Sequence, residues 1–258
     1  MTTRERPGGV LMIVALLVLG AVGADVVRRG LPQLRHVAAP DPAPAASLPG
    51  HRDTVASAHG ASAPADSAGP ARSRIRARIA EEADYTYIAG TLLETDSTIR
   101  RWPDERLSRP LAVCVIRERV DGFRDEFVAD LAYALGRWNG VLPLGLSTGA
   151  DSATADVVVT WTAQLDSGKT GRTDLTWDRR GIIHHAFVTL ATHDPSGRLL
   201  DPQRMSALAL HEIGHALGLG HSPVREDALY PVATALELTD RDRRTARLLY
   251  ELPPGSIR

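Results

Sequence analysis

Three histidines and one glutamate in the last quarter of the chain have the types and spacing of a catalytic metal site. His211 and His215 are four residues apart, so on a helix their imidazoles share one face and can converge on one ion. Glu212 stands beside them, where its carboxylate can reach a metal-bound water. Gly218 favours positive φ, which lets the chain leave the helix and return His221 as a third ligand. Three nitrogens with one open position predict a catalytic zinc rather than a closed structural one.

The alternative interpretation is a core helix whose histidines are incidental. Two histidines and a glutamate on an otherwise apolar helix face would be costly to bury without a metal. The full pattern H-E-x-x-H-x-x-G-x-x-H is also far more specific than a bare H-E-x-x-H. We therefore favour the metal site.

Composition excludes some other classes of function. The chain has 258 residues and a formal net charge of −1, so it lacks the basic footprint of a nucleic-acid-binding protein. Its single cysteine, Cys114, cannot form an internal disulfide and is expected as a small core residue in the apolar run Leu111–Ile116.

The amino terminus indicates export. Arg4 and Arg6 precede the apolar run Val10–Gly23, whose small final residues are typical of a signal-peptide cleavage site. If the run continues to Val27, it reaches the short end of a membrane-spanning helix. Residues 1–29 are therefore expected to be a cleaved signal peptide or an N-terminal membrane anchor. A buried core helix is the third, less favoured interpretation.

Residues 30–72 are rich in Ala, Pro and Ser and are expected to form a disordered tether. The histidines at 36, 51 and 59 lie in this tether and are not expected to bind zinc. Residues 73–258 are expected to form the folded domain.

The expected elements alternate as strand, helix, four strands and helix, which predicts an α/β (α+β) fold with a mixed sheet backed by two helices. The site helix begins at Asp201-Pro202, with Asp as N-cap, and a last helix runs from Leu238-Thr239-Asp240 to about Tyr250. The other expected elements are a helix at Arg72–Glu82 with an exposed basic face, a β-type segment at Tyr85–Leu93 that opens the folded unit, a polar connection at Thr95–Pro110, a helix at Gly122–Trp138, and strands at Leu111–Ile116, Val141–Leu146, Ala155–Ala163, Thr170–Trp177 and Gly181–Leu190.

The histidine motif resembles that of the metzincin metallopeptidases, and Ser222 directly after His221 resembles the matrixin branch more narrowly. In matrixins the loop after the third histidine ends in Ala-Leu-Met-Tyr-Pro. Here a loop of the same length ends in Asp227-Ala228-Leu229-Tyr230-Pro231, so Leu229 stands where the family has methionine. Leu for Met conserves volume, and the site is expected to tolerate it. The closing helix is also similar to that of the matrixins.

The resemblance implies a zincin fold, with a small C-terminal helical subdomain below the cleft, and an exported, monomeric zinc endopeptidase acting on proteins or peptides. It implies that His211, His215 and His221 bind Zn²⁺ and that Glu212 is the general base. It places Leu229, Tyr230 and Pro231 at a substrate pocket. The strand Thr170–Trp177 would pair with an extended substrate.

The sequence also departs from the family. No cysteine is available to block the zinc in a zymogen, and no His-rich segment for a structural zinc is recognisable. The corresponding region of this chain contains His184, His185, His193 and Asp194. Because neighbouring residues in a strand face opposite ways, we favour ordinary strand and loop roles for them over a second zinc site. Loops at Asp166 and Asp194 are candidates for Ca²⁺. The alternative functions are a zinc-binding interaction domain without proteolytic activity and a zinc hydrolase for non-protein amides.

Overall fold

A computed structural model describes residues 68–107, 109–117, 120–141 and 146–258. The expected signal peptide or anchor and nearly all of the expected tether lie outside the described residues. Within the described ranges, no helix is both long enough and apolar enough to cross a membrane.

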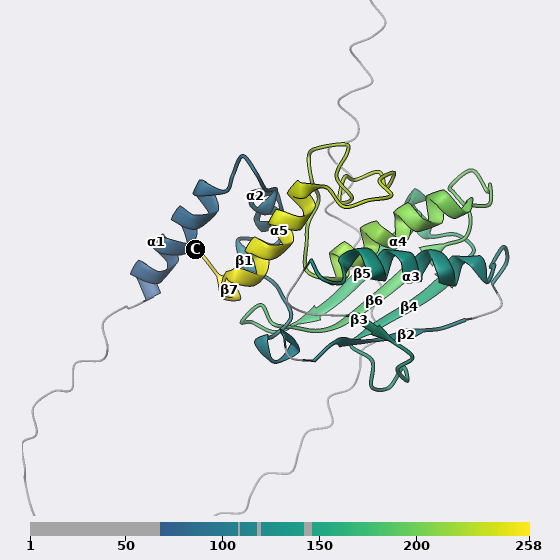
Figure 1. Ribbon diagram of the computed structural model, residues 1–258, viewed down its shortest axis with the longest axis horizontal. Helices are drawn as coiled ribbons and strands as arrows, with labels where there is room; N and C mark the ends of the chain where they lie inside the picture. Colours follow the sequence, from purple (N-terminus) through teal and green to yellow (C-terminus); the bar gives the residue numbers. More distant parts are fainter. Residues whose placement is uncertain (1–67, 108, 118–119, 142–145) are drawn as a thin grey trace, which may run out of the picture. The chain divides into compact units, whose positions relative to one another are not determined.

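A five-stranded mixed sheet forms the centre of the domain (Figure 1). Its order is β3-β2-β4-β6-β5, and β5 alone runs antiparallel to its neighbour. The apolar runs in β2 and β4 suit parallel strands that are covered on both faces, as is usual for such strands. The strands are β2 (Leu111–Val115), β3 (Leu146–Thr148), β4 (Val157–Thr162), β5 (Gly171–Trp177) and β6 (Ile183–Ala191).

Two helices, α3 (Glu126–Trp138) and α4 (Pro202–Ala216), lie side by side against one face of this sheet (Figure 1). Helix α4 starts as the sequence predicts, because the Asp201 side chain accepts a hydrogen bond from the backbone N–H of Arg204 and Pro202 occupies the first helical position. From β2 to α4, the order of strands and helices is the predicted one.

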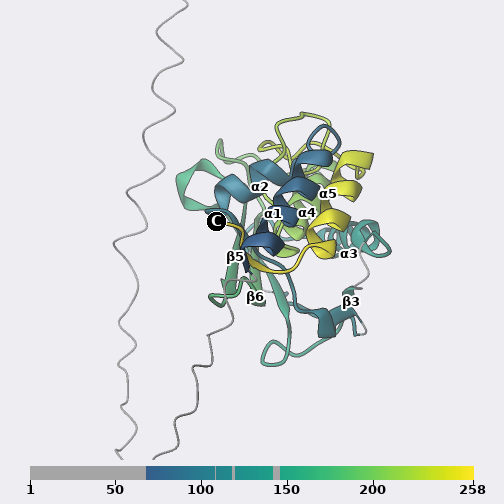
Figure 2. The ribbon, with the colours of Figure 1, turned by 90° about the vertical axis from the view of Figure 1, so that its left-hand side faces the viewer.

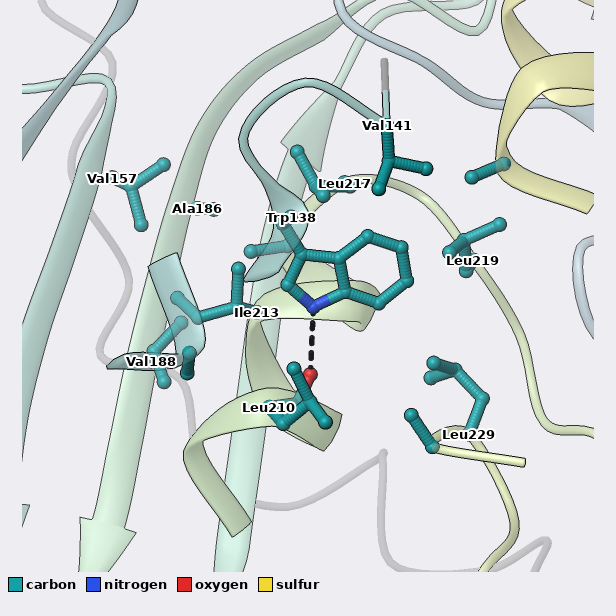
Figure 3. Close-up of a cluster of buried hydrophobic side chains, with 14 of the residues drawn as sticks. Trp138, Val141, Val157, Ala186, Val188, Leu210, Ile213, Leu217, Leu219 and Leu229 are labelled. Atoms are coloured by element: carbon teal, nitrogen blue, oxygen red, sulfur yellow. Dashed lines mark hydrogen bonds between the residues drawn. The ribbon is translucent and has the colours of Figure 1, made fainter. Parts of the chain in front are cut away.

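The core between the helices and the sheet centres on Trp138 (Figure 3). Its indole is 1% exposed, and its Nε1–H donates to the carbonyl of Leu210 at 2.9 Å. Val157 and Val188 reach it from the sheet, and Ile213 comes from α4 (Figure 3). This packing fixes α4, and so the residues that α4 carries, relative to the sheet.

The two ends of the described chain meet beside α5 (Figures 1 and 2). Helix α5 opens with a capping box between Thr239 and Asp242. Strand β1 pairs antiparallel with β7 after that helix, and Trp102 is buried and donates to the carbonyl of Ala216 at 2.9 Å. The remaining elements are α1 (Ala68–Glu81), α2 (Ile88–Glu94), β1 (Thr98–Ile99), the 3-10 helices η1 (Asp104–Leu107) and η2 (Asp166–Gly168), α5 (Asp240–Glu251) and β7 (Gly255–Ser256).

The β-type prediction for Tyr85–Leu93 is wrong, because the segment forms helix α2 instead. Ile88, Thr91 and Leu92 recur at helical spacing and are buried on one face, so tertiary packing overrides the β-propensity of the segment.

Three element boundaries also differ from the predictions by more than two residues. Helix α3 begins at Glu126, since Gly122 has a φ of +72° and belongs to the preceding turn. The strand expected at Val141–Leu146 is β3, at Leu146–Thr148, and residues 142–145 lie outside the described part of the chain. Helix α1 begins at Ala68, slightly before the predicted domain boundary.

Trp138→Phe tests the role of the indole in the core. The variant loses the hydrogen bond to Leu210 and leaves a small void, so we expect the free energy of unfolding to fall by about 2 kcal/mol in urea denaturation. Trp177→Phe is the matched control: that side chain is 43% exposed, and the substitution should change stability by less than about 0.5 kcal/mol. Equal effects of the two substitutions would contradict this account of the core.

Candidate metal centre

The three histidines predicted as ligands come together at the end of α4. His211 and His215 project from the same face of the helix, which ends at Ala216. Gly218 has a φ of +95°, and a Cβ there would collide with the carbonyl oxygen of Arg100. Only glycine allows this close turn, and the turn returns His221 to the other two rings.

The histidines form a compact nitrogen cluster. One ring nitrogen from each of the three residues lies within 4.8 Å of the others, and the Nε2 atoms of His211 and His215 are 3.0 Å apart. Imidazole nitrogens are common zinc ligands, and three of them leave a fourth position open for water or substrate. The donor set therefore fits a catalytic zinc ion.

Each imidazole is oriented through its other nitrogen. The Nδ1 atoms of His211 and His215 lie 2.8 Å from the carbonyl oxygens of Ala228 and Leu219, respectively. A carbonyl oxygen only accepts hydrogen bonds, so both Nδ1 atoms carry the proton and both Nε2 lone pairs face the cluster.

Burial also sets the charge of two of the rings. It lowers the pKa of His211 to about 4 and that of His215 to about 3, since desolvation disfavours the imidazolium form. Both rings are neutral at pH 7, which is the form that binds a metal.

The carboxylate of Glu212 faces strand β5. Its Oε2 accepts a hydrogen bond from the Thr173 hydroxyl at 2.7 Å, and the same hydroxyl is 3.1 Å from the backbone carbonyl of Glu212. A Cβ on Gly171 would come within 2.7 Å of the Glu212 carboxyl carbon, so the strand makes room for this side chain. Burial raises the pKa of Glu212 to about 7, although the Thr173 hydrogen bond acts in the opposite direction.

The cluster opens into a cavity of about 1050 Å³. Residues of edge strand β5, with Gly171 and Thr173, line this cavity, and so does the segment Pro231–Thr234. All three histidines and Glu212 line this cavity. A site of this size, open beside a sheet edge, can admit an extended chain.

Two of the polar side chains that contact the site residues were missed by sequence reasoning. Glu94 contacts His221, and Thr173 contacts Glu212. Neither lies within the motif, and Glu94 precedes His221 by 127 positions, so no local spacing signal could connect them.

Comparison with known proteins identifies the family. The family model described as Matrixin matches residues 106–251, which is more than half of the chain. The chain belongs to the matrixin family. The match places it in a family of zinc metalloendopeptidases.

Two plant matrixins are similar to this chain. Metalloendoproteinase 2-MMP of Arabidopsis thaliana is 27% identical over 179 residues, covering 60% of this chain and 44% of the relative. Metalloendoproteinase 4-MMP of the same plant is 30% identical over 115 residues, covering 38% and 31% respectively. The chain thus spans less than half the length of these curated relatives.

The matrixin methionine position is occupied by a buried leucine. Leu229 is fully buried, and a Cβ on Gly214 would come within 2.7 Å of its Cδ2 and 2.9 Å of the Trp138 ring. Leu229 therefore packs against the site helix at Gly214 and does not line the cavity. Of the three predicted pocket residues, only Pro231 lines it. Leu229 and Tyr230 are not among the residues that line it.

The candidate sites for a second zinc and for calcium gain no support. The possible metal ligands in the described ranges are the side chains of His, Cys, Asp and Glu. Among them, His211, His215 and His221 form the only group of three or more that lie close enough to share a metal ion. Among the other histidines of the described residues, His184 is exposed, and the Nδ1 of His193 is 2.9 Å from the Thr192 hydroxyl. Asp194 accepts backbone hydrogen bonds from Ser196 and Arg198 in its own turn. That network, led by the Ser196 hydroxyl, lowers the pKa of Asp194 to about 2.

Leu229→Met restores the family residue, and we expect the zinc content of the purified protein to stay unchanged. The two side chains have similar volumes, so the unfolding free energy should change by less than about 1.5 kcal/mol. Elemental analysis and a chelator competition measure the metal. A clear gain in zinc affinity would mean that leucine weakens the site.

Glu212→Gln tests the buried carboxyl in the metal-free protein. The folded state holds the Glu212 proton more tightly than the unfolded chain, whose pKa is near the ordinary 4.5, so wild-type stability falls as the pH rises from about 4.5 to about 7. The variant lacks this loss. Its stability relative to wild type should therefore increase, between pH 4.5 and pH 8, by on the order of 3 kcal/mol. Urea unfolding at both pH values measures the difference, and a difference that does not vary with pH would refute the assignment.

Proposed function

We propose that this protein is an exported zinc-dependent endopeptidase in which Glu212 is the general base. The observation that carries the proposal is the meeting of three imidazoles with the carboxylate of Glu212 at one open cavity. His211, His215 and His221 would hold the zinc ion. When bound, the ion would supply a Lewis acid and lower the pKa of a coordinated water toward about 7.

Glu212 would move the proton during hydrolysis. Its carboxylate takes a proton from the attacking water and then delivers it to the amine that leaves, so one group acts first as base and then as acid. Thr173 holds one carboxylate oxygen at 2.7 Å, which fixes the direction of the other. The buried setting favours a carboxylate whose pKa lies close to the working pH.

The substrate would bind as an extended strand along β5. In the described part of the chain this strand is at the edge of the sheet and pairs only with β6, which leaves its other edge available for an added strand. The segment Pro231–Thr234 also lines the cavity and would contact substrate side chains. A protein or peptide is therefore the proposed substrate, cleaved by a monomeric enzyme.

Export is proposed from the N-terminal sequence alone. The basic residues and apolar run at Val10–Gly23 support a signal peptide or a membrane anchor, and residues 30–72 would then tether the catalytic domain outside the cytoplasm. Mass spectrometry of the mature N-terminus distinguishes the two, because an anchor would keep residues 1–29.

The second candidate is a zinc-binding domain that serves an interaction without proteolysis. A binding site needs only the three histidines, and it would have no use for a carboxyl whose burial raises its pKa to about 7. A zinc hydrolase for a non-protein amide shares the chemistry and differs only in substrate.

Glu212→Ala in the full-length protein separates these functions. We expect the wild type to cleave casein or gelatin and the variant to lose at least about 100-fold of that activity with one zinc still bound, since general-base catalysis typically contributes 10²–10⁴-fold. Glu226→Ala, at an exposed position in the loop after His221, is the control and should keep full activity. Cleavage that persists in Glu212→Ala would contradict the proposed mechanism. A wild type that binds zinc but cleaves no peptide would favour the alternative functions.

A further inference from the structure

Helix α2 brings a carboxylate to the third histidine. The Oε1 atom of Glu94, the last residue of this helix, is 3.0 Å from the Nδ1 atom of His221 and accepts the backbone N–H of His221 at 3.1 Å. Helix α2 lies outside residues 106–251, the part of the chain that matches the matrixin family. An element preceding the matched domain therefore reaches its metal centre.

We propose that Glu94 is a positioning residue that orients His221 for zinc, so that helix α2 completes the metal site. The proposal rests on the zinc site of the proposed function and adds a fourth residue to it. Glu94 would act through His221 and not as a metal ligand, because it contacts the Nδ1 atom and the backbone of that histidine.

His221 needs such an anchor more than the other two ligands. His211 and His215 are fixed by the helix backbone and by carbonyl acceptors. His221 lies beyond the helix in an irregular segment, and its side chain is 40% exposed. Without the contact to Glu94, rotation about its side-chain bonds would be opposed by few neighbours, and ordering the ring on metal binding would cost more conformational entropy.

The chemistry of the contact suits a zinc ligand. An ionised carboxylate only accepts hydrogen bonds, so Nδ1 of His221 donates to it and the lone pair of Nε2 is left for the metal. A carboxylate partner also makes the imidazole a stronger base, and loss of such partners typically weakens metal affinity 10–100-fold. Among the three histidines, only His221 has a charged partner at Nδ1.

Helix α2 is held firmly enough to deliver this carboxylate. The Thr91 hydroxyl accepts the backbone N–H of Gly220 at 3.0 Å, and a Cβ on Gly220 would lie 2.8 Å from the Cα of Thr91. At the start of the helix, the Tyr87 hydroxyl donates to Asp242 of α5 at 3.0 Å. These buried contacts fix the start and the middle of α2 against the domain.

Glu94 also lines the substrate cavity, which suggests a competing role. An exposed carboxylate in the cleft could instead bind a basic side chain of the substrate. That role would change KM for substrates containing Lys or Arg and would leave the affinity for zinc untouched. The two roles therefore differ in a measurement that needs no enzyme activity.

The test is the zinc affinity of the full-length protein, measured by competition with a chromophoric chelator. We expect Glu94→Gln to weaken zinc binding about tenfold and Glu94→Ala by up to about 100-fold. The urea midpoints of the metal-free variants should stay near that of the wild type, since the carboxylate is 44% exposed. Glu81→Gln, at an exposed residue of α1, is the matched control and should bind zinc like the wild type.

A second variant separates the carboxylate from the packing of its helix. Thr91→Val removes the hydrogen bond to Gly220 but keeps a side chain of the same shape and the Tyr87–Asp242 contact, which should hold α2 and Glu94 in place. We therefore expect it to reduce zinc affinity less than threefold, although it lowers stability. If Thr91→Val weakened zinc binding as much as Glu94→Gln does, the proposal would be overturned, because anchoring of the loop at Gly220 would then explain the effect. Unchanged zinc affinity in Glu94→Gln would overturn it too, with or without a change in KM. If the wild type itself bound no zinc, the proposed function would fail instead.

Discussion

The structure depends on bringing three imidazoles together, two of them on helix α4, without leaving their Nδ1 atoms unpaired. Unpaired buried polar groups are costly, and here each Nδ1 has an acceptor from a different part of the chain. The acceptor for His211 is the carbonyl of Ala228, that for His215 is the carbonyl of Leu219, and that for His221 is a carboxylate. These three bonds determine that the Nε2 atoms face one another and the cavity.

The apolar core keeps this arrangement rigid. Trp138 packs between the sheet and helix α4, and Leu229 fills the space beneath the helix where Gly214 has no side chain. A leucine in place of the family methionine is compatible with the site because the position provides volume and not a ligand. The segment that presents the wall of the cavity, Pro231–Thr234, follows directly from this buried leucine.

The terminal segments belong to the same physical unit as the site. A buried network connects Tyr87 of α2 with Asp242 of α5, and Asp242 also accepts the backbone N–H of Ala228. Ala228 in turn accepts the hydrogen bond from His211. Burial raises the pKa of Tyr87 and, against the hydrogen bonds that it accepts, that of Asp242. Helix α2, which precedes residue 106, therefore supports the three-histidine site as well as the packing of α5.

The sequence by itself determined which three histidines come together, the glutamate beside them, the glycine turn and the strand–helix order from β2 to α4. Each of these depends on local spacing or on hydrophobic periodicity, which a short stretch of sequence contains. Only the tertiary structure decided that Tyr85–Leu93 holds a helix, that Thr173 contacts Glu212, and that Tyr230 lies outside the cavity. These features arise from contacts between segments far apart in the chain, where burial overrides local propensity and no spacing rule applies.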